Sequence, residues 1–499
     1  MDKVRATTTG VLGDALVAAG HPLPMPCRGR HTCGKCGVHV AGELAAPDAV
    51  EAELLRRVHQ PALPGYSYRL ACLARFTGEA SVIASSISGI VVADVDLGLP
   101  AYDGPAPHTL GCAIDIGTTT ITVLLFRLSD NELLADASQL NHQAAHGSDV
   151  ISRIDAAARV GVEVLQALVV DQLSGMLREV LERAGEPGSA VTRMCITGNT
   201  TMLHLLTGLP VASLGAHPFT PQTLFATSLP ATGFFPFLTE AEIYLPPAIS
   251  TFVGPDITCG LLATGLGTQG GAELLVDVGT NGEMALAANG RLWCCSTAAG
   301  PAFEGAEISA GMPALPGAID DVWEQDGNVR FTTIGRKRPK GICGTGLISA
   351  IDTYLRLDTI DPTGAMAGSS LLVGDSQISI TQDDVRRLQL AKAAVAAGVD
   401  TLLWEGGLSP EEIEVLHLAG GFGSYLQPRS AAGIGLIPWP LAEKTNPAGN
   451  TALTGAVLLA LSRDARRTAE TWAAEATELS LANHRVWMDR FIENMAFLG

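Results

Sequence analysis

A strand, a short Gly/Thr turn and a second strand occur twice in this chain, about 160 residues apart. The first copy reads GCAIDIGTTTITVLLF, in which Asp115 ends an apolar strand and Gly117–Thr120 forms the turn. The second copy reads ELLVDVGTNGEMALAA, with Asp277 at the matching place. One such hairpin is weakly specific, because glycine turns between strands are common. Two copies predict a duplicated α/β fold that closes on one ligand.

The residue types in these turns indicate a nucleotide phosphate. Curled Gly/Thr turns offer backbone N–H groups and hydroxyls to phosphate oxygens, and a carboxylate at the strand end can hold Mg²⁺ and its waters. We therefore expect Asp115 and Asp277 to handle Mg²⁺ or the hydrolytic water. The residues expected to bind phosphate are Gly117, Thr118, Thr119, Thr120, Gly279, Thr280, Asn281 and Gly282.

Two further glycine turns fit the same ligand. VLHLAGGFGSYL is a strand that enters a turn, where the backbone can approach adenosine or ribose; the glycines concerned are Gly420, Gly421 and Gly423. CGTGLISAI opens a helix at Gly344, and a helix N-terminus favours phosphate. Asp256 is a further candidate for supporting Mg²⁺. Glu283 is a candidate for polarising water, although an exposed strand-end glutamate is the favoured interpretation.

Four cysteines near the start are spaced to hold an iron–sulfur cluster. Their pattern is C-x5-C-x2-C followed by a distant fourth, formed by Cys27, Cys33, Cys36 and Cys72. Three thiolates on one loop plus a distant fourth is the arrangement of a plant- or adrenodoxin-type [2Fe–2S] ferredoxin. A zinc site would usually show two paired C-x2-C knuckles. That alternative and four unrelated buried cysteines stay open. Strand patterns and helices near Gly13–Ala19 and Asp48–His59 predict a small β-grasp-like domain.

Composition limits the partners and the compartment. The net charge of −19 argues against nucleic acid or an anionic membrane. Residues 1–80 carry a balance of +2, so the rest carries −21, which indicates a separate N-terminal unit. We find no apolar run of 18 residues and no signal peptide, and so expect a cytoplasmic protein in which cysteines bind metal.

The expected domains follow from these motifs. They are a ferredoxin-like domain at 1–85, a linker at 86–110, a first ATPase-like lobe at 111–270 and a second at 271–499. The C-terminal segment reads as a helix, a strand at Glu478–Leu481 and a last helix, and we expect these helices to return to the first lobe. The predicted class is therefore multidomain α/β.

Several other residues favour ordinary structural roles. His204 and His417 lie in apolar stretches typical of core histidines, and the pair Cys294–Cys295 is typical of buried thiols. The basic run that begins at Arg336 reads as a solvated loop.

The motifs DIGTTT, DVGTNGE and AGGFG resemble the phosphate-1, phosphate-2 and adenosine motifs of the acetate and sugar kinase/Hsp70/actin superfamily. Joined to an N-terminal [2Fe–2S] domain, the chain resembles the reductive activators of corrinoid proteins. The stretches ITGNTTMLHLLTGL, AAGPAFEGAEISAGM and GNTALTGAVLLALS resemble that family as well. The resemblance covers almost the whole chain.

This resemblance implies an ATP-hydrolysing redox activator. Such proteins pass one electron from the [2Fe–2S] cluster to a Co(II) corrinoid and regenerate Co(I) for methyl transfer. The implied cofactors are the cluster, ATP and Mg²⁺. The implied partners are the corrinoid protein of a methyltransferase system and an external ferredoxin or reductase, with a homodimer also open. The alternatives are an activator of the dehydratase type, a nucleotide-sensing ferredoxin without turnover, and a small-molecule kinase with an accessory cluster.

Overall fold

The computed structural model describes residues 2–18, 36–58, 66–84, 102–104, 109–147, 149–268, 270–305, 307–420 and 426–497. Most of the predicted linker 86–110 lies outside the described residues, as do Cys27, Cys33, Gly421 and Gly423. The chain divides into two compact units, Met1–Ala93 and Asp94–Gly499.

The N-terminal unit is a small antiparallel sheet with two helices. Its strands, in spatial order, are β1 (Asp2–Val11), β4 (Arg75–Ala84), β2 (Gly37–Leu44) and β3 (Ser67–Leu70). Its helices are α1 (Leu12–Ala18) and α2 (Ala49–Val58), at the positions expected from the sequence. Apolar side chains that include Leu16, Val38 and Phe76 form its core.

The second unit begins with a six-stranded sheet. In spatial order its strands are β7 (Leu133–Leu140), β6 (Thr120–Arg127), β5 (Leu110–Ile116), β8 (Val191–Gly198), β10 (Glu242–Leu245) and β9 (Thr227–Pro230). The helices of this half are α3 (Val150–Val160), α4 (Val162–Ala184), α5 (Thr200–Thr207) and α6 (Pro255–Thr264). Helix α4 packs on β6 and β7.

A second six-stranded sheet repeats this plan. Its spatial order is β20 (Thr445–Gly449), β19 (Val415–Ala419), β11 (Glu273–Val278), β12 (Gly282–Ala288), β13 (Arg291–Thr297) and β21 (Thr477–Glu478). In each sheet an antiparallel three-stranded meander, β5–β6–β7 or β11–β12–β13, is followed by two parallel strands on the other side. The predicted duplicated α/β fold is confirmed.

Smaller elements complete the second half. The two small sheets consist of β14 (Ala318–Gln325), β15 (Asn328–Thr333) and β16 (Gly341–Ile342), and of β17 (Ser370–Leu372) and β18 (Ser379–Thr381). The helices are α7 (Gly344–Arg356), α8 (Gln382–Gly406), α10 (Pro428–Gly433), α11 (Trp439–Ala442), α12 (Thr451–Leu461), α13 (Arg463–Glu475) and α14 (Trp487–Glu493).

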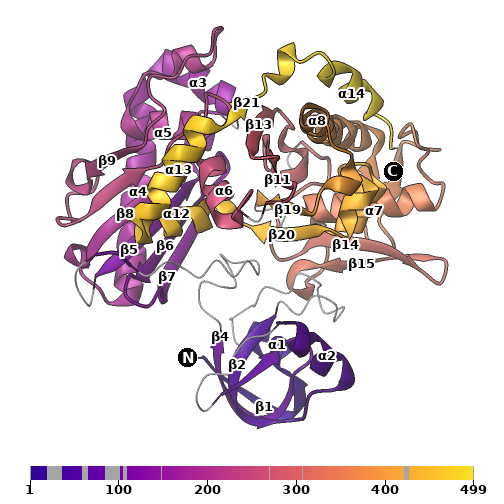
Figure 1. The fold of residues 1–499 in the computed structure, drawn as a ribbon. Helices are drawn as coiled ribbons and strands as arrows, with labels where there is room; N and C mark the ends of the chain where they lie inside the picture. The colour runs from indigo at the N-terminus through magenta and orange to yellow at the C-terminus, as the bar shows by residue number, and fades with distance from the viewer. Residues whose placement is uncertain are drawn as a thin grey trace. The chain divides into compact units, whose positions relative to one another are not determined.

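The two halves are joined through helices that follow equivalent strands. Helix α6 follows β10 and α12 follows β20, and these two helices pack closely on each other. A Cβ at Gly455 of α12 would lie 2.2 Å from the carbonyl oxygen of Cys259 in α6, so only glycine allows this approach. Helix α12 also packs on β5 and β8, whereas α14 packs on α8. Figure 1 shows α6 between the two large sheets.

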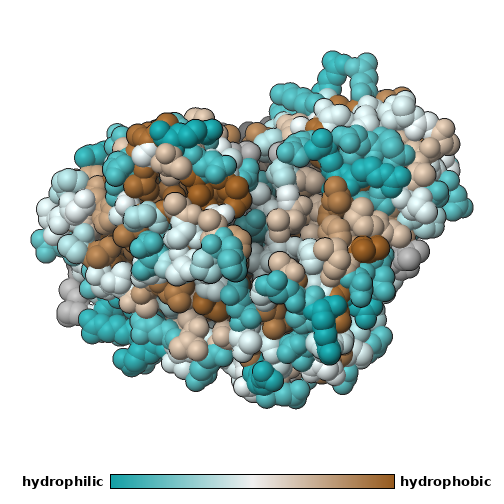
Figure 2. All heavy atoms as spheres, turned by 90° about the horizontal axis from the view of Figure 1, so that it is seen from above, coloured by the Kyte–Doolittle hydropathy of each residue, from teal (hydrophilic) through white to brown (hydrophobic). Residues whose placement is uncertain are grey.

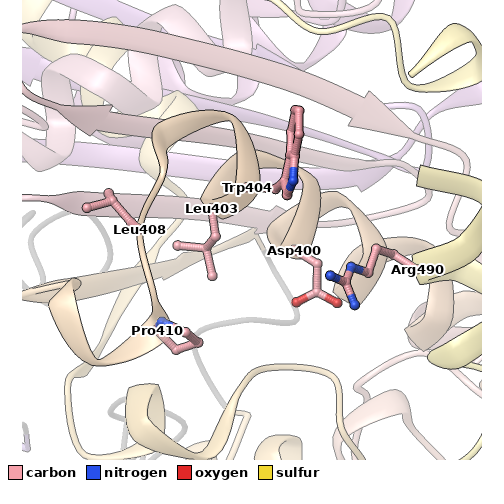
Figure 3. A pocket seen from close by; sticks show the side chains of 6 residues that line it. All are labelled: Asp400, Leu403, Trp404, Leu408, Pro410 and Arg490. Carbon is pink, nitrogen blue, oxygen red and sulfur yellow. The ribbon is translucent and has the colours of Figure 1, made fainter. Parts of the chain in front are cut away.

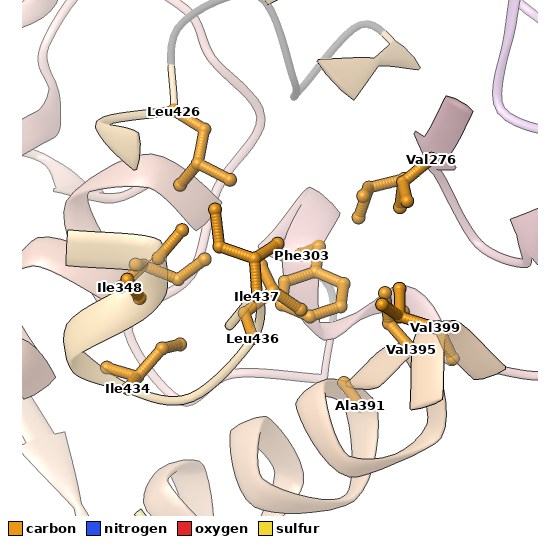
Figure 4. Packing of buried hydrophobic residues seen from close by; sticks show 14 of the residues in the cluster. Val276, Phe303, Ile348, Ala391, Val395, Val399, Leu426, Ile434, Leu436 and Ile437 are labelled. Atoms are coloured by element: carbon orange, nitrogen blue, oxygen red, sulfur yellow. The ribbon is translucent and has the colours of Figure 1, made fainter. Parts of the chain in front are cut away.

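A buried cluster of the second half supports the segment after β13. This segment ends in the short helix η6 (Pro301–Glu304), and its Phe303 is 1% exposed. Figure 4 shows Phe303 among Val395 and Val399 of α8 and Ile437. Burial of a phenylalanine contributes a few kcal/mol, so η6 is fixed to this core.

Among the described helices, none has by itself the length and hydropathy to cross a membrane; the bent pair α3 and α4 meets that criterion by length and composition only.

Candidate functional site

The first hairpin is a tight turn held by side chains from three other segments. The Gly117 N–H donates to the Thr120 carbonyl oxygen at 3.0 Å, which closes the turn. Asn141 Nδ2 donates to the Gly117 carbonyl oxygen at 2.9 Å. The fully buried Arg153 guanidinium donates to the Thr118 carbonyl oxygen. The conformation of this turn is therefore determined before any ligand binds.

The second hairpin is closed in a similar way, by a turn that is one residue shorter and has fewer supports. The Gly279 N–H donates to the Asn281 carbonyl oxygen at 2.9 Å. The Gly300 N–H donates to the Thr280 carbonyl oxygen at 2.9 Å, as the Asn141 N–H does to the Thr119 carbonyl oxygen. At the start of β12, a Cβ on Gly282 would lie 2.9 Å from the Val395 side chain, so this glycine is also required by packing on α8.

One carboxylate joins the two hairpins. Thr119 Oγ1 donates to Glu304 Oε2 at 2.7 Å, and Thr280 Oγ1 donates to Glu304 Oε1 at 2.8 Å. The structure thus brings the two turns to within the width of one carboxyl group. Glu304 lies in the stretch AAGPAFEGAEISAGM that resembles the family, but nothing in that stretch distinguishes it from its neighbours.

Three aspartates from different elements lie close enough to repel one another. Asp115 and Asp277 stand next to last in β5 and β11, and Asp256 lies in the first turn of α6. Burial raises the pKa of Asp115 to about 6. Burial, and then the charge of Asp115, raise the pKa of Asp256 to about 7. Burial, and then the charges of Asp256 and Asp115, raise the pKa of Asp277 to about 8.

Glu283 belongs to the same cluster, and the favoured interpretation of it as an exposed glutamate is wrong. It is 8% exposed and lies directly opposite Asp277 in the β11–β12 ladder. Burial, then repulsion by Asp256 and Asp277, raise its pKa well above the ordinary value, against a side-chain hydrogen bond from Asn281. Because Glu283 is the cross-strand partner of Asp277, the two side chains lie on the same face of the sheet. That face is buried.

This carboxylate cluster suits a hydrated cation. Like charges in a buried site ionise together only when a cation compensates them. Within the described residues, no three His, Cys, Asp or Glu side chains converge as a ready-made metal site. Mg²⁺ commonly keeps several waters and binds through one or two carboxylates plus substrate phosphates. The cluster therefore fits Mg²⁺ that arrives with a nucleotide.

Two asparagines that the sequence analysis did not single out connect helix ends to the first hairpin. Asn199 caps α5 by accepting from the Met202 N–H at 2.9 Å, and its Nδ2 donates to Thr118 Oγ1 at 3.1 Å. Asn450 caps α12 by accepting from the Leu453 N–H at 2.8 Å, and its Nδ2 donates to Asp115 Oδ2 at 2.8 Å. The tripeptide Gly-Asn-Thr occurs at both places, 198–200 and 449–451, and this repeat is the sequence feature that could have indicated the two asparagines.

The structure describes some of the remaining residues that are predicted to bind the nucleotide. Gly420 follows β19 with φ of 93°, and a Cβ there would lie 2.7 Å from Asp277 Oδ1, so this turn starts beside the second hairpin. Gly421 and Gly423 lie outside the described residues. Gly344 begins α7, whose N-cap residue Cys343 makes no side-chain capping bond, and α7 packs beside η6. The contacts of these residues with a nucleotide stay a prediction.

The ordinary structural roles predicted for the histidines, the cysteine pair and the basic run are confirmed by the burial or exposure of these residues. His204 is fully buried, its Nε2 accepts from the Gln222 N–H, and burial lowers its pKa. Burial also lowers the pKa of His417, to about 4. Cys294 and Cys295 are buried free thiols. Residues 335–338 of the basic run are exposed.

In the N-terminal unit, two of the four predicted cluster ligands meet. Cys36 Sγ and Cys72 Sγ are 3.2 Å apart, close enough to bind one iron, and the Cys72 N–H points at Cys36 Sγ at 3.4 Å. The buried Arg69 binds both carboxylate oxygens of Glu51, which fixes β3 to α2 just before Cys72. Cys27 and Cys33 lie outside the described residues.

A surface pocket of about 260 Å³ lies away from these groups, between the C-terminal end of α8 and α14. Figure 3 shows Asp400 beside Arg490 on one side and Leu408 and Pro410 on the other. None of its lining residues belongs to the hairpins or to the carboxylate cluster.

Comparison with known proteins identifies the family. Residues 271–499 match the model of the C-terminal domain of RACo, the ASKHA domain, and residues 110–269 match the RACo middle region. The corrinoid activation enzyme RamQ of Eubacterium limosum is 32% identical over 78% of this chain and 70% of its own length. A [Co(II) methylated amine-specific corrinoid protein] reductase of Methanosarcina barkeri is 30% identical over 71% of this chain and 70% of its own.

A solved structure agrees with these relatives. The reductive activator for corrinoid, iron–sulfur protein superposes with a TM-score of 0.72 at 28% identity, covering 99% of this chain and 98% of that one. The expected resemblance to reductive activators of corrinoid proteins is thereby confirmed, and with it the ATPase-like class of the two-lobed unit. The chain belongs to the RACo family.

Proposed function

We propose that this protein uses ATP to drive reductive activation of a corrinoid protein. One electron enters through the N-terminal iron–sulfur domain and converts the partner's Co(II) corrinoid to Co(I), ready for methyl transfer. The observation that carries the proposal is that the two Gly/Thr turns meet at Glu304. The mutually repelling Asp115, Asp256 and Asp277 stand beside them. That arrangement suits a metal–triphosphate complex.

In this proposal the two turns hold the nucleotide phosphates with their N–H groups and threonine hydroxyls. Asp115 and Asp277, with Asp256 and Glu283 behind them, hold Mg²⁺ through its waters. The glycines that begin at Gly420 approach the adenosine, and the N-terminus of α7 at Gly344 faces phosphate. The proposed modules are residues 1–85, 111–270 and 271–499. Of the C-terminal helices expected to return to the first lobe, we keep α13 in the proposal and not α14, which packs on α8.

The N-terminal unit fits an iron–sulfur cluster, and we propose the [2Fe–2S] type. The thiols of Cys36 and Cys72 already face each other, and thiolate is the ligand that such clusters require. Cys27 and Cys33 would complete the set. The bound cluster would supply a one-electron carrier. The chain's own residues hold its ligands in place through the buried Glu51–Arg69 pair.

ATP is needed because the electron step is uphill. In a one-electron equilibrium every 59 mV of mismatch changes the ratio about tenfold. A ligand shifts a conformational equilibrium only by its different affinity for the two states. The turns that would bind the triphosphate lie on separate sheets, which α6 and α12 connect, so nucleotide binding can change how the two sheets sit against each other.

The partner must dock on the protein surface. Figure 2 shows apolar patches separated by hydrophilic side chains on one face of the molecule. Large exposed hydrophobic residues in the second unit include Leu140, Leu372 and Ile492, each at least 61% exposed. Such a partner would dock where exposed apolar side chains form a contiguous patch. An external ferredoxin or reductase would supply the electron.

The test is Co(I) formation. The reconstituted protein is mixed with a low-potential reductant, Mg²⁺ and a Co(II) corrinoid protein, and Co(I) is followed by absorbance with and without ATP. Suitable partners are a methylated-amine corrinoid protein and a corrinoid iron–sulfur protein, the substrates named for the relatives. We expect Co(I) only when ATP is present.

A Cys72→Ser variant is the control for the electron path. It should lose the visible absorption of the cluster and Co(I) formation, while ATP binding survives. ATP turnover that ignores every corrinoid protein would leave a nucleotide sensor instead. A phosphorylated small-molecule product would indicate a kinase.

A further inference from the structure

Glu304 breaks the symmetry of the two hairpins. Counted back from Ile121 in β6 and Gly282 in β12, Thr119 and Thr280 hold equivalent places in the two turns. Each carbonyl oxygen accepts from a residue that lies beyond the third strand of its sheet, Asn141 or Gly300. Their hydroxyls nevertheless converge on a single carboxylate, which comes from the second half alone. No equivalent acidic residue of the first half takes part in this contact among the described residues.

The chemistry of this contact is that of a phosphate group. A carboxylate and a terminal phosphate both present negatively charged oxygens to hydroxyl donors. Thr119 and Thr280 are among the four threonines, with Thr118 and Thr120, whose hydroxyls are expected to bind phosphate oxygens. In the structure Glu304 holds both donors, at distances of 2.7 and 2.8 Å. The carboxylate and a bound triphosphate would therefore compete for the same two hydroxyls.

We propose that Glu304 is a latch that stands in for the terminal phosphate of the nucleotide and keeps the two hairpins together until ATP displaces it. This inference rests on the proposed function, because it assumes that the hairpins bind ATP. It adds a regulatory step to that site. Triphosphate binding must break two charge-assisted hydrogen bonds, and the nucleotide then replaces Glu304 as the link between the lobes.

The segment around Glu304 allows its side chain to move while its backbone stays in place. Phe303 next to it is buried in the core. Gly300 and Gly305 flank the segment with φ of 79° and 76°, and a Cβ at Gly305 would lie 2.5 Å from the Met312 carbonyl oxygen. The Glu304 side chain itself is half-buried, and among the described residues its hydrogen bonds are those to Thr119 and Thr280, so rotation about its own bonds releases both hydroxyls.

Calorimetry on the full-length protein tests the latch without any corrinoid partner. Binding of the non-hydrolysable analogue AMPPNP with Mg²⁺, and of adenosine, is measured for the wild type, Glu304→Ala and Glu307→Ala. Glu307 lies in the same segment, is exposed and pairs with Arg387 instead. We expect Glu304→Ala to bind AMPPNP about tenfold more tightly or better, because two hydrogen bonds to a charged group no longer have to be broken. Adenosine, which has no phosphate, should bind with unchanged affinity, and Glu307→Ala should match the wild type.

A double-mutant cycle places the effect at the hydroxyls. In a Thr280→Val background, Glu304→Ala should tighten AMPPNP binding by a smaller factor, since one of the two bonds is already absent. Equal or weaker AMPPNP binding by Glu304→Ala overturns the latch; weaker binding would make Glu304 a direct ligand of Mg²⁺ or nucleotide. If the wild type binds neither ligand, the proposed function itself fails, which is a different result from the failure of the latch.

Discussion

The two halves of the ATPase-like unit share one topology but differ in how their key aspartates are satisfied. Asp115 in β5 lies opposite Thr122 and accepts a hydrogen bond from Asn450. Asp277 in β11 lies opposite Glu283 and has no such donor among the described residues. The same burial that raises the pKa of Asp115 to about 6 raises that of Asp277, with two repelling aspartates, to about 8.

This difference assigns the halves different roles. At pH 7 Asp115 is largely ionised and its turn is already braced by Asn141, Arg153 and Asn199. The raised pKa of Asp277 favours its protonated form at pH 7. The first hairpin is therefore a preformed scaffold, and in the proposed function the second completes its charge state only when Mg²⁺ binds.

The largest effect should come from Asp277→Asn. Removing this carboxylate should reduce ATP-stimulated Co(I) formation roughly 100-fold or more, the size of loss typical when a group that stabilises charge is removed. The same change should raise the thermal stability of the Mg²⁺-free protein at pH 8, because it removes a charge that its neighbours repel. Co(I) absorbance and thermal unfolding measure the two effects, and the cluster spectrum should be unchanged. Surviving ATP stimulation would show that Asp277 has another role.

The pH dependence should be dominated by the second hairpin. Mg²⁺ must displace protons from groups with raised pKa, so its affinity should weaken by up to about tenfold for each pH unit as pH falls from 8 to 6. Without Mg²⁺, the stability of the folded protein changes with pH in the opposite direction to the Mg²⁺ affinity. A carboxyl with a raised folded-state pKa contributes stability below the ordinary pKa near 4, and this stability is lost as pH rises through about 8.

Asp256→Asn is the test of that pH prediction, because after burial the charge of Asp256 raises the pKa of Asp277 most. It should lower the pKa of Asp277 and move the pH profile of Mg²⁺ binding to lower pH, as measured by calorimetry. An unchanged profile would mean that Asp256 does not set the charge state of Asp277.

Asn450→Ala should destabilise the protein by about 2.5–4 kcal/mol. It removes the cap of α12, worth about 1 kcal/mol, and a hydrogen bond to an ionised carboxylate, worth about 1.5–3 kcal/mol. Asn450→Ser is the control, since serine can keep the cap but is too short to reach Asp115 as asparagine does. Urea unfolding at pH 7 measures both. Equal losses in the two variants would show that the bond to Asp115 contributes nothing.

Asn199→Ala should cost less, about 1–2 kcal/mol in the same unfolding measurement. Its cap is equivalent, but its second bond goes to the neutral hydroxyl of Thr118. A loss as large as that of Asn450→Ala would show that the charge of Asp115 does not strengthen its hydrogen bond with Asn450.

The local sequence determined the elements and the type of chemistry. Strand–turn–strand patterns with an aspartate next to last predicted both hairpins, and the duplication predicted two related sheets. Cysteine spacing predicted the ligands of the N-terminal unit, two of which the structure brings together. The hairpins and the loop that carries the first three cysteines depend on residues within a few positions of one another, where backbone preferences and ligand spacing act directly. Cys72 follows Cys36 by 36 residues and meets it only in the fold.

Only the tertiary structure decided which distant residues share the site. Asn450 reaches Asp115, Glu304 reaches both turns, and Glu283 is buried rather than exposed. Each depends on how one sheet and its helices pack against the other, and long-range packing leaves no periodic signal in one sequence. The raised pKa values have the same origin, because burial and repulsion arise only once three separate segments are folded together.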